Sequence, residues 1–277
     1  ILIPPSIPMI IYGFVTEESV ISLFLAGIGP GIALLLFFIV FSMIYARLGG
    51  QEREAKQGWT ERRRATLRAL PAVVLAVLII SGIYSGAFTP TEAAAIGFAA
   101  SLIITGPIMR VLTWDAFKKA VFDSMATTVA ILLIIAGAKI FGKAITLYRI
   151  PQDISVMITQ GIDTELGFIL IVTAVLLVMG LVFEALSMVL IMTPVLLPAA
   201  LVLGFDPIWF GVYMVIMVEC ALITPPVGLN LYVIQSVAKA RLGEVASGVA
   251  PFLILMFACA ALLYLWHDLA LYIPFKM

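Results

Sequence analysis

Two proline pairs, Pro4-Pro5 and Pro225-Pro226, interrupt strongly apolar stretches of the chain. A proline pair removes two backbone donors and clashes with carbonyls of the preceding turn, so neither pair fits an unbroken helix. The carbonyl groups that such a break frees need a partner, and at bilayer depth a cation is a suitable one. A simple proline kink, which membrane helices tolerate, is the alternative. The chemistry indicated at both pairs is coordination of a cation by backbone oxygens.

Two carboxylates also lie in apolar surroundings. Glu184 interrupts an apolar run, and Glu219 lies five residues before Thr224. An ionised side chain at bilayer depth is costly and is usually functional. Glu184 would attract a cation or connect its loop to the broken helix; a hydrated carboxylate outside the membrane is the alternative. Glu219 would brace the break.

Groups typical of enzymes are scarce. The chain has one histidine, no metal-spaced cluster, no glycine-rich phosphate loop and no serine–histidine arrangement. An intramembrane enzyme would need paired His or Asp residues in facing spans. The sequence therefore predicts neither an enzyme nor an organic cofactor.

The composition indicates the elements that must position these groups. Of 277 residues, 63% are hydrophobic and 12% are charged, whereas soluble proteins average about 25% charged residues. The apolar runs are continuous, which favours helices over the alternating strands of a membrane barrel. The formal net charge is zero, so nucleic acid is not an expected partner. The fold class predicted is an all-α polytopic membrane protein, with the lipid bilayer as its surroundings.

The order of the spans follows from the apolar runs and the basic residues. Segment 47–68 carries seven Lys or Arg residues against three Glu, which places it in the cytoplasm by the positive-inside rule. It is either a solvated loop or an amphipathic helix on anionic lipid. The predicted helices and spans lie near 6–15, 20–46, 70–87, 91–111, 124–146, 165–182, 189–203, 206–240 (interrupted at the second proline pair) and 246–271.

An internal repeat relates the two proline pairs. Their offset of 221 residues also relates Gly27 to Gly248 and Pro30 to Pro251. Positions of Gly and Pro are dictated by backbone geometry, so a shared set predicts a shared backbone. The charge map makes the two copies run in opposite directions, and inverted repeats with broken helices are typical of secondary transporters.

The repeat divides the chain into three parts. Residues 1–46 would be the end of the first repeat, 47–68 a cytoplasmic connector, and 69–277 the second repeat. The first copy lacks a counterpart of 91–220, so we expect an N-terminal part of about 130–150 further residues in the native protein.

Five motifs, in order along nearly the whole chain, carry a family resemblance. The chain resembles the large membrane subunit of tripartite ATP-independent periplasmic (TRAP) transporters, the DctM type. The matching strings are Ile3-Pro4-Pro5-Ser6-Ile7-Pro8, Phe88-Thr89-Pro90-Thr91-Glu92-Ala93-Ala94-Ala95, Thr193-Pro194-Val195-Leu196-Leu197-Pro198, Gly204-Phe205-Asp206-Pro207 and Leu222-Ile223-Thr224-Pro225-Pro226-Val227-Gly228-Leu229-Asn230-Leu231.

The resemblance implies an activity and partners. The expected activity is Na⁺-coupled, elevator-type import of an organic acid (a C4-dicarboxylate, a sugar acid or a similar carboxylate) across the bacterial inner membrane. The expected partners are a small membrane subunit of the DctQ type and a periplasmic substrate-binding protein of the DctP type. A stand-alone Na⁺/anion carrier of the same superfamily is the alternative, and it would not need the binding protein.

The resemblance also implies a re-entrant hairpin at 165–203 and a broken helix at 206–240. An ordinary loop between two spans is the alternative to the hairpin, whose tip would lie at 180–187. The expected Na⁺ ligands are Gly180, Ala221, Thr224 and Val227, with Ile3 and Ser6 in a second Na⁺ site through the offset of 221 residues. The expected substrate-binding residues are Glu184, Ser187, Asn230, Pro225 and Pro226. Ala221 replaces the glycine usual in the family, a change that keeps the backbone carbonyl.

Three further local features of the sequence have structural interpretations. Thr89 and Glu92 flank Pro90 in the pattern of a capping box, and Asp206 before Pro207 is a predicted N-cap. Lys139 and Lys143 are four residues apart and so share one helix face. They would face the hairpin or an anionic substrate, or extend to the outer membrane surface.

Overall fold

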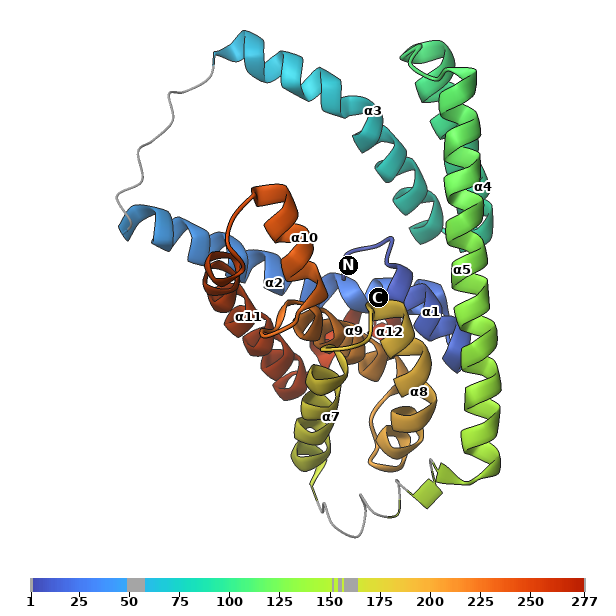
Figure 1. Ribbon diagram of the computed structural model, residues 1–277, viewed down its shortest axis with the longest axis vertical. Coiled ribbons are helices and arrows are strands. Elements are labelled where there is room, and N and C mark those ends of the chain that lie inside the picture. Colours follow the sequence, from blue (N-terminus) through green and yellow to red (C-terminus); the bar gives the residue numbers. More distant parts are fainter. Residues whose placement is uncertain (1, 49–57, 151, 154–155, 157–163, 277) are drawn as a thin grey trace. The chain divides into compact units, whose positions relative to one another are not determined.

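A computed structural model describes residues 2–48, 58–150, 152–153, 156 and 164–276, and all regular elements in these ranges are helical (Figure 1). The all-α prediction is confirmed. The elements are α1 (Ile7–Thr16), α2 (Val20–Leu48), α3 (Trp59–Tyr84), α4 (Pro90–Ile103), the π-helix η1 (Ile104–Ile108), α5 (Trp114–Leu147), α7 (Glu165–Met179), α8 (Ala185–Val202), α9 (Pro207–Ile223), α10 (Leu229–Ala238), α11 (Leu242–Leu265) and α12 (Asp268–Lys276).

Six helical segments in the described part of the chain are long and apolar enough to cross a membrane. They are α2, α3, α4 with η1, α5, α8 and α11. The prediction of a polytopic membrane protein is therefore confirmed. Helix α7, with 15 residues, is shorter than this group, and whether α7 and α8 form a re-entrant hairpin stays a prediction.

Some boundaries differ from those expected. Helix α3 begins at Trp59 and α5 at Trp114, earlier than the apolar runs at 70 and 124, because the preceding Arg and Lys residues are themselves good helix formers. Residues 49–57 of the expected connector lie outside the described residues. The last predicted span, at 246–271, is present as α11, but its predicted end is wrong, because α11 ends at Leu265 and α12 begins at Asp268. At this interruption the His267 ring stacks on Trp209, with ring centroids 4.7 Å apart.

The chain forms two compact units, whose boundaries fall within α2 and α5. One unit comprises Ile1–Met43 and Leu133–Met277, and the other comprises Ile44–Leu132. In the second unit α3 packs against α4, which η1 continues. Thr89 and Glu92 form the predicted capping box at the start of α4. The proline pairs, the turn between α7 and α8, and the break at the second proline pair all belong to the first unit. The three-part division by repeat stays a prediction.

Helix α9 is the core of the first unit. It packs against α1, α7, α8, α10, α11 and α12, and between Ile208 and Leu222 only Glu219 is not fully buried. The helix begins where predicted, because the Asp206 carboxylate accepts hydrogen bonds from the backbone N–H groups of Ile208 (2.8 Å) and Trp209 (3.1 Å). A helix that is apolar on all sides is expected to be buried on all sides, so α9 can hold the break at its end in a fixed place.

The α1–α9 contact depends on a buried hydroxyl. Tyr12 of α1 donates a hydrogen bond of 2.7 Å to the Pro207 carbonyl at the start of α9. Replacing Tyr12 by phenylalanine should lower the free energy of unfolding by about 0.5–1.5 kcal/mol, because the ring stays and only the donor is lost. Thermal unfolding of the two forms in the same detergent measures this; an equal or higher midpoint for the variant would contradict it.

The segments after the two proline pairs are alike in length and termination. Both Pro–Pro peptide bonds are cis. Helices α1 and α10 have ten residues each, and each ends at a residue with positive φ, Glu17 (61°) and Lys239 (52°). A long helix, α2 or α11, then follows. The opposite direction of the two copies stays a prediction.

Candidate functional site

The second proline pair breaks a helix as expected. Helix α9 ends at Ile223 and α10 begins at Leu229. In a continuous helix the carbonyls of Ala221 and Leu222 would accept from the N–H groups four residues later, but Pro225 and Pro226 have none. The Ala221 carbonyl accepts instead from the Thr224 N–H at 3.3 Å. The break therefore leaves backbone oxygens with spare acceptor capacity at the end of a buried helix.

Thr224 and Gly228 shape the break. The Thr224 hydroxyl donates to the Cys220 carbonyl at 2.6 Å, so its proton is used and the lone pairs on its oxygen remain available as acceptors. Gly228 has φ of 41°, and a Cβ there would lie 3.0 Å from the Thr224 carbonyl oxygen. Glycine at this position therefore allows the chain to turn close to that oxygen before α10 begins.

The turn after α7 lies against the end of α9. Gly180 follows Met179, the last residue of α7, and α8 begins at Ala185. A Cβ on Gly180 would lie 2.4 Å from the Ala221 Cβ and 3.0 Å from the Ala221 carbonyl carbon. Both residues are buried. The structure thus brings together two of the four predicted ligands, from segments about 40 positions apart in the sequence.

The other predicted residues of this site have different exposures. Thr224 and Val227 are half-buried, whereas Pro225 and Pro226 are exposed. Asn230 is half-buried in the first turn of α10. Carbonyl and hydroxyl oxygens are hard ligands of the kind that alkali and alkaline-earth cations prefer. Which of these residues bind an ion or a substrate stays a prediction.

Glu184 has a local role that the sequence reasoning missed. It is the exposed N-cap of α8, where its carboxylate accepts from the backbone N–H groups of Leu186 (3.0 Å) and Ser187 (2.8 Å). The Ser187 hydroxyl also donates to it, at 2.8 Å. In the described part of the chain no hydrogen bond joins Glu184 to the break at 224–228. An acid at the start of an apolar run is favoured by the helix dipole, and this is the signal that could have revealed the cap.

This cap yields a stability prediction. Replacing Glu184 by alanine should cost about 1 kcal/mol of stability, because two N–H groups at the start of α8 lose their acceptor. Replacing it by glutamine should cost less, since an amide oxygen still accepts. Thermal unfolding of both variants measures this order. Equal midpoints for the wild type and the alanine variant would show that the cap is unimportant.

The residues of the expected second Na⁺ site occupy the segment before α1. Ser6 is buried and caps α1, accepting from the Met9 N–H at 3.4 Å. This segment lies directly on α2. A Cβ on Gly27 would lie 2.5 Å from the Leu2 carbonyl oxygen, and one on Gly31 would lie 2.8 Å from the Ile3 Cγ1. Two glycines four residues apart therefore form the surface against which the segment packs.

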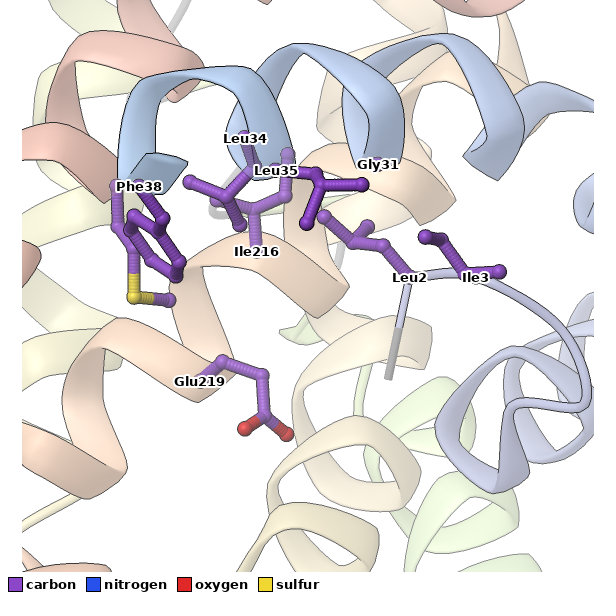
Figure 2. Close-up of a pocket in the computed structure, with 9 residues that line it drawn as sticks. Leu2, Ile3, Gly31, Leu34, Leu35, Phe38, Ile216 and Glu219 are labelled. Carbon is purple, nitrogen blue, oxygen red and sulfur yellow. The ribbon is translucent and has the colours of Figure 1, made fainter. Parts of the chain in front are cut away.

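Ile3 shares a cavity with Glu219. The cavity has a volume of about 340 Å³, and Figure 2 shows Glu219 extending from α9 while Leu34, Leu35 and Phe38 project from α2. One Glu219 carboxylate oxygen is shielded from solvent and has no hydrogen-bond partner among the described residues. The other lining residues are apolar or glycine: Leu2, Ile3, Gly31, Leu34, Leu35, Phe38, Ile216 and Met256. The structure thus associates Glu219 with the segment of the first proline pair, a placement that the sequence reasoning did not foresee.

Comparison with known proteins places this chain in a family. Residues 1–269 match the family model described as "Tripartite ATP-independent periplasmic transporter, DctM component". The chain is 39% identical over 259 residues to the C4-dicarboxylate TRAP transporter large permease protein DctM of Pseudomonas aeruginosa, covering 92% of this chain and 60% of that protein. It is 32% identical over 273 residues to the sialic acid TRAP transporter large permease protein of Vibrio cholerae, covering 99% and 64%.

A third relative has a further substrate in its name. The chain is 33% identical over 273 residues to the ectoine TRAP transporter large permease protein of Halomonas elongata, covering 98% of this chain and 64% of the relative. The chain thus spans 60 to 64% of the length of these three proteins. The family match, the identities and the six candidate spans lead to one conclusion: the chain belongs to the DctM component family of TRAP transporters, which are multi-pass proteins of the bacterial inner membrane and not enzymes.

Proposed function

We propose that the full protein imports an organic acid together with Na⁺ as the large membrane subunit of a TRAP transporter. The observation that supports this most strongly is the contact of Gly180 with Ala221, directly before the break at 224–228. This contact places the turn between α7 and α8 against the end of α9, where backbone carbonyl oxygens lack the N–H donors of a continuous helix. Such an arrangement, on the family's broken helix, suits a cation that is bound and released during transport.

The ligand chemistry supports Na⁺ over a divalent ion. The proposed ligands at Gly180, Ala221, Thr224 and Val227 are uncharged carbonyl and hydroxyl oxygens. Sites for Ca²⁺ and Mg²⁺ use carboxylates to balance the charge. The Glu184 carboxylate in the neighbouring turn is already hydrogen-bonded to the start of α8. A neutral set of oxygens around a monovalent cation leaves one net charge, which a carboxylate substrate can balance.

The substrate class is a small carboxylate. Relatives are named for C4-dicarboxylate, sialic acid and ectoine, and this range supports an organic acid without selecting one. The Ser187 hydroxyl is a polar group beside the turn, three positions after Glu184. The Asn230 amide is a polar group beside the break, a few positions after Pro225 and Pro226. We further propose a small DctQ-type membrane subunit, a periplasmic DctP-type binding protein and movement of the site across the membrane by an elevator mechanism.

Reconstitution of the full protein tests this function. The permease and its small subunit are placed in proteoliposomes, and uptake of labelled succinate, sialic acid and ectoine is measured with the binding protein outside. Uptake of at least one probe should need both an inward Na⁺ gradient and the binding protein. Uptake that persists without the binding protein would favour the stand-alone carrier, and uptake that is unchanged when K⁺ replaces Na⁺ would contradict Na⁺ coupling.

A further inference from the structure

One face of α5 carries two lysines beside a cavity. Lys139, Gly142, Lys143 and Thr146 recur at helical spacing, so they lie on a single face. All four line a cavity of about 270 Å³. The opposite wall comes from Val15 of α1 and from Leu190 and Pro194 of α8, with Ala138 completing the lining. The cavity lies within the first compact unit, apart from the proposed Na⁺ site residues.

The two ammonium groups have no ion-pair partner in the described part of the chain. Neither lysine forms an ion pair or a hydrogen bond there; the salt bridge described for this chain joins Lys276 and Asp268. Lys139 has instead an aromatic neighbour, with its ammonium 4.8 Å from the centroid of the Phe14 ring. Like charges four residues apart on a helix repel each other by about 0.2–0.5 kcal/mol. A bound anion would remove that repulsion.

The other side chains that line the cavity offer no free hydrogen-bond donor, so the lysines must bind the anion. The Thr146 hydroxyl donates to the Gly142 carbonyl at 2.7 Å, so its proton is not available to a ligand. Val15, Leu190 and Pro194 are apolar. Each ammonium offers three donors, which suits the several oxygens of a phosphate or carboxylate. Gly142 lies between the lysines, and a Cβ there would be 4.0 Å from the Pro194 side chain, so larger side chains at this position would enter the space.

We propose that this cavity is an oxyanion-binding site, in which the ammonium groups of Lys139 and Lys143 together hold one phosphate or carboxylate group. The phosphate of an anionic phospholipid and the carboxylate of a small organic acid share this chemistry. The carboxylate source rests on the proposed function, whereas the lipid source does not. Because α1 and α8 supply the opposite wall, the anion would lie between the lysine face of α5 and these two helices.

The experiment uses the full-length protein in phosphatidylcholine nanodiscs. Its thermal unfolding midpoint is measured alone, with phosphatidylglycerol added to the bilayer, and with succinate added to the solution. An anion at about ten times its dissociation constant should raise the midpoint by roughly 2–4 °C. A rise with phosphatidylglycerol identifies a lipid as the source, and a rise with succinate identifies an organic acid. Absence of a rise in both cases overturns the proposal.

Four variants separate this site from general charge effects, and each is compared with its own midpoint without anion. The rise should vanish in the double variant Lys139→Gln/Lys143→Gln and persist in Lys139→Arg/Lys143→Arg. It should also persist in Lys118→Gln/Lys119→Gln, which removes two charges from the same helix outside the cavity. Gly142→Leu keeps both lysines and fills the cavity, so it should abolish the rise. A rise that survives in the double variant Lys139→Gln/Lys143→Gln would overturn the proposal. A rise that survives in Gly142→Leu would also overturn it, and would show that the lysines only reach the membrane surface.

Discussion

Replacing Gly180 by alanine should abolish most Na⁺-dependent uptake by the full-length protein. The added Cβ would lie 2.4 Å from the Ala221 Cβ and 3.0 Å from the Ala221 carbonyl carbon, so the turn or the end of α9 must move. Overpacking of this kind typically costs about 1–3 kcal/mol. If that cost falls on the ion-bound form, the Na⁺ concentration for half-maximal uptake should rise roughly 5- to 150-fold. Uptake as a function of Na⁺ concentration measures it.

Two further variants make the Gly180 prediction specific. Gly137→Ala adds the same methyl to α5, where a Cβ meets nothing within 4 Å, and it should leave uptake unchanged. Ala221→Gly removes the nearest obstacle, so Gly180→Ala combined with Ala221→Gly should recover part of the activity. The recovery should be incomplete because the Ala221 backbone remains within about 3.1 Å. Uptake by Gly180→Ala at the wild-type rate and Na⁺ dependence would show that this contact is not part of the site.

Replacing Thr224 by valine should raise the Na⁺ concentration for half-maximal uptake about tenfold, equivalent to about 1.4 kcal/mol of binding free energy. Valine preserves the branched shape but removes the hydroxyl, which donates to the Cys220 carbonyl and keeps its lone pairs free to accept or to ligate an ion. Replacement by serine keeps the hydroxyl and should leave the Na⁺ dependence near that of the wild type. Uptake against Na⁺ concentration compares the three proteins.

A matched control distinguishes ion binding from helix stability. The Thr127 hydroxyl donates to the Asp123 carbonyl at 2.9 Å, the same local bond at a position on α5 outside the break. Thr127→Val should therefore leave the half-saturating Na⁺ concentration unchanged. If Thr224→Val also leaves it unchanged, the hydroxyl is not a ligand and any Na⁺ is held by carbonyl oxygens.

The parts of the site that were predictable from sequence depend on local chemistry. The pair Pro225-Pro226 removes two adjacent backbone donors, which an unbroken helix does not accommodate, and the structure has the break there. The sequence analysis places Gly180 and Ala221 in one site, and the structure has them in contact. Asp206 acts as the predicted N-cap of α9, since a cap needs only its own next few residues.

The parts that were not predictable depend on tertiary packing or on local hydrogen bonds that occupy a side chain. Glu184 appeared isolated among apolar residues, yet in three dimensions its carboxylate is used by the first turn of α8. Glu219 lies in the chain near Thr224, but its side chain lines a cavity together with Ile3, more than 200 positions away. The interruption at His267 coincides with stacking on Trp209, a partner that periodicity along α11 does not reveal.

A density map of the full-length protein, determined with Na⁺ and again with Na⁺ replaced by choline, tests the central proposal most directly. The proposal predicts an ion peak in the Na⁺ map that is bounded by oxygens of Gly180, Ala221, Thr224 and Val227, and no such peak in choline. A map in which the space between the turn at 180–184 and the break at 224–228 is empty in Na⁺, or in which the ion lies away from these oxygens, would contradict it.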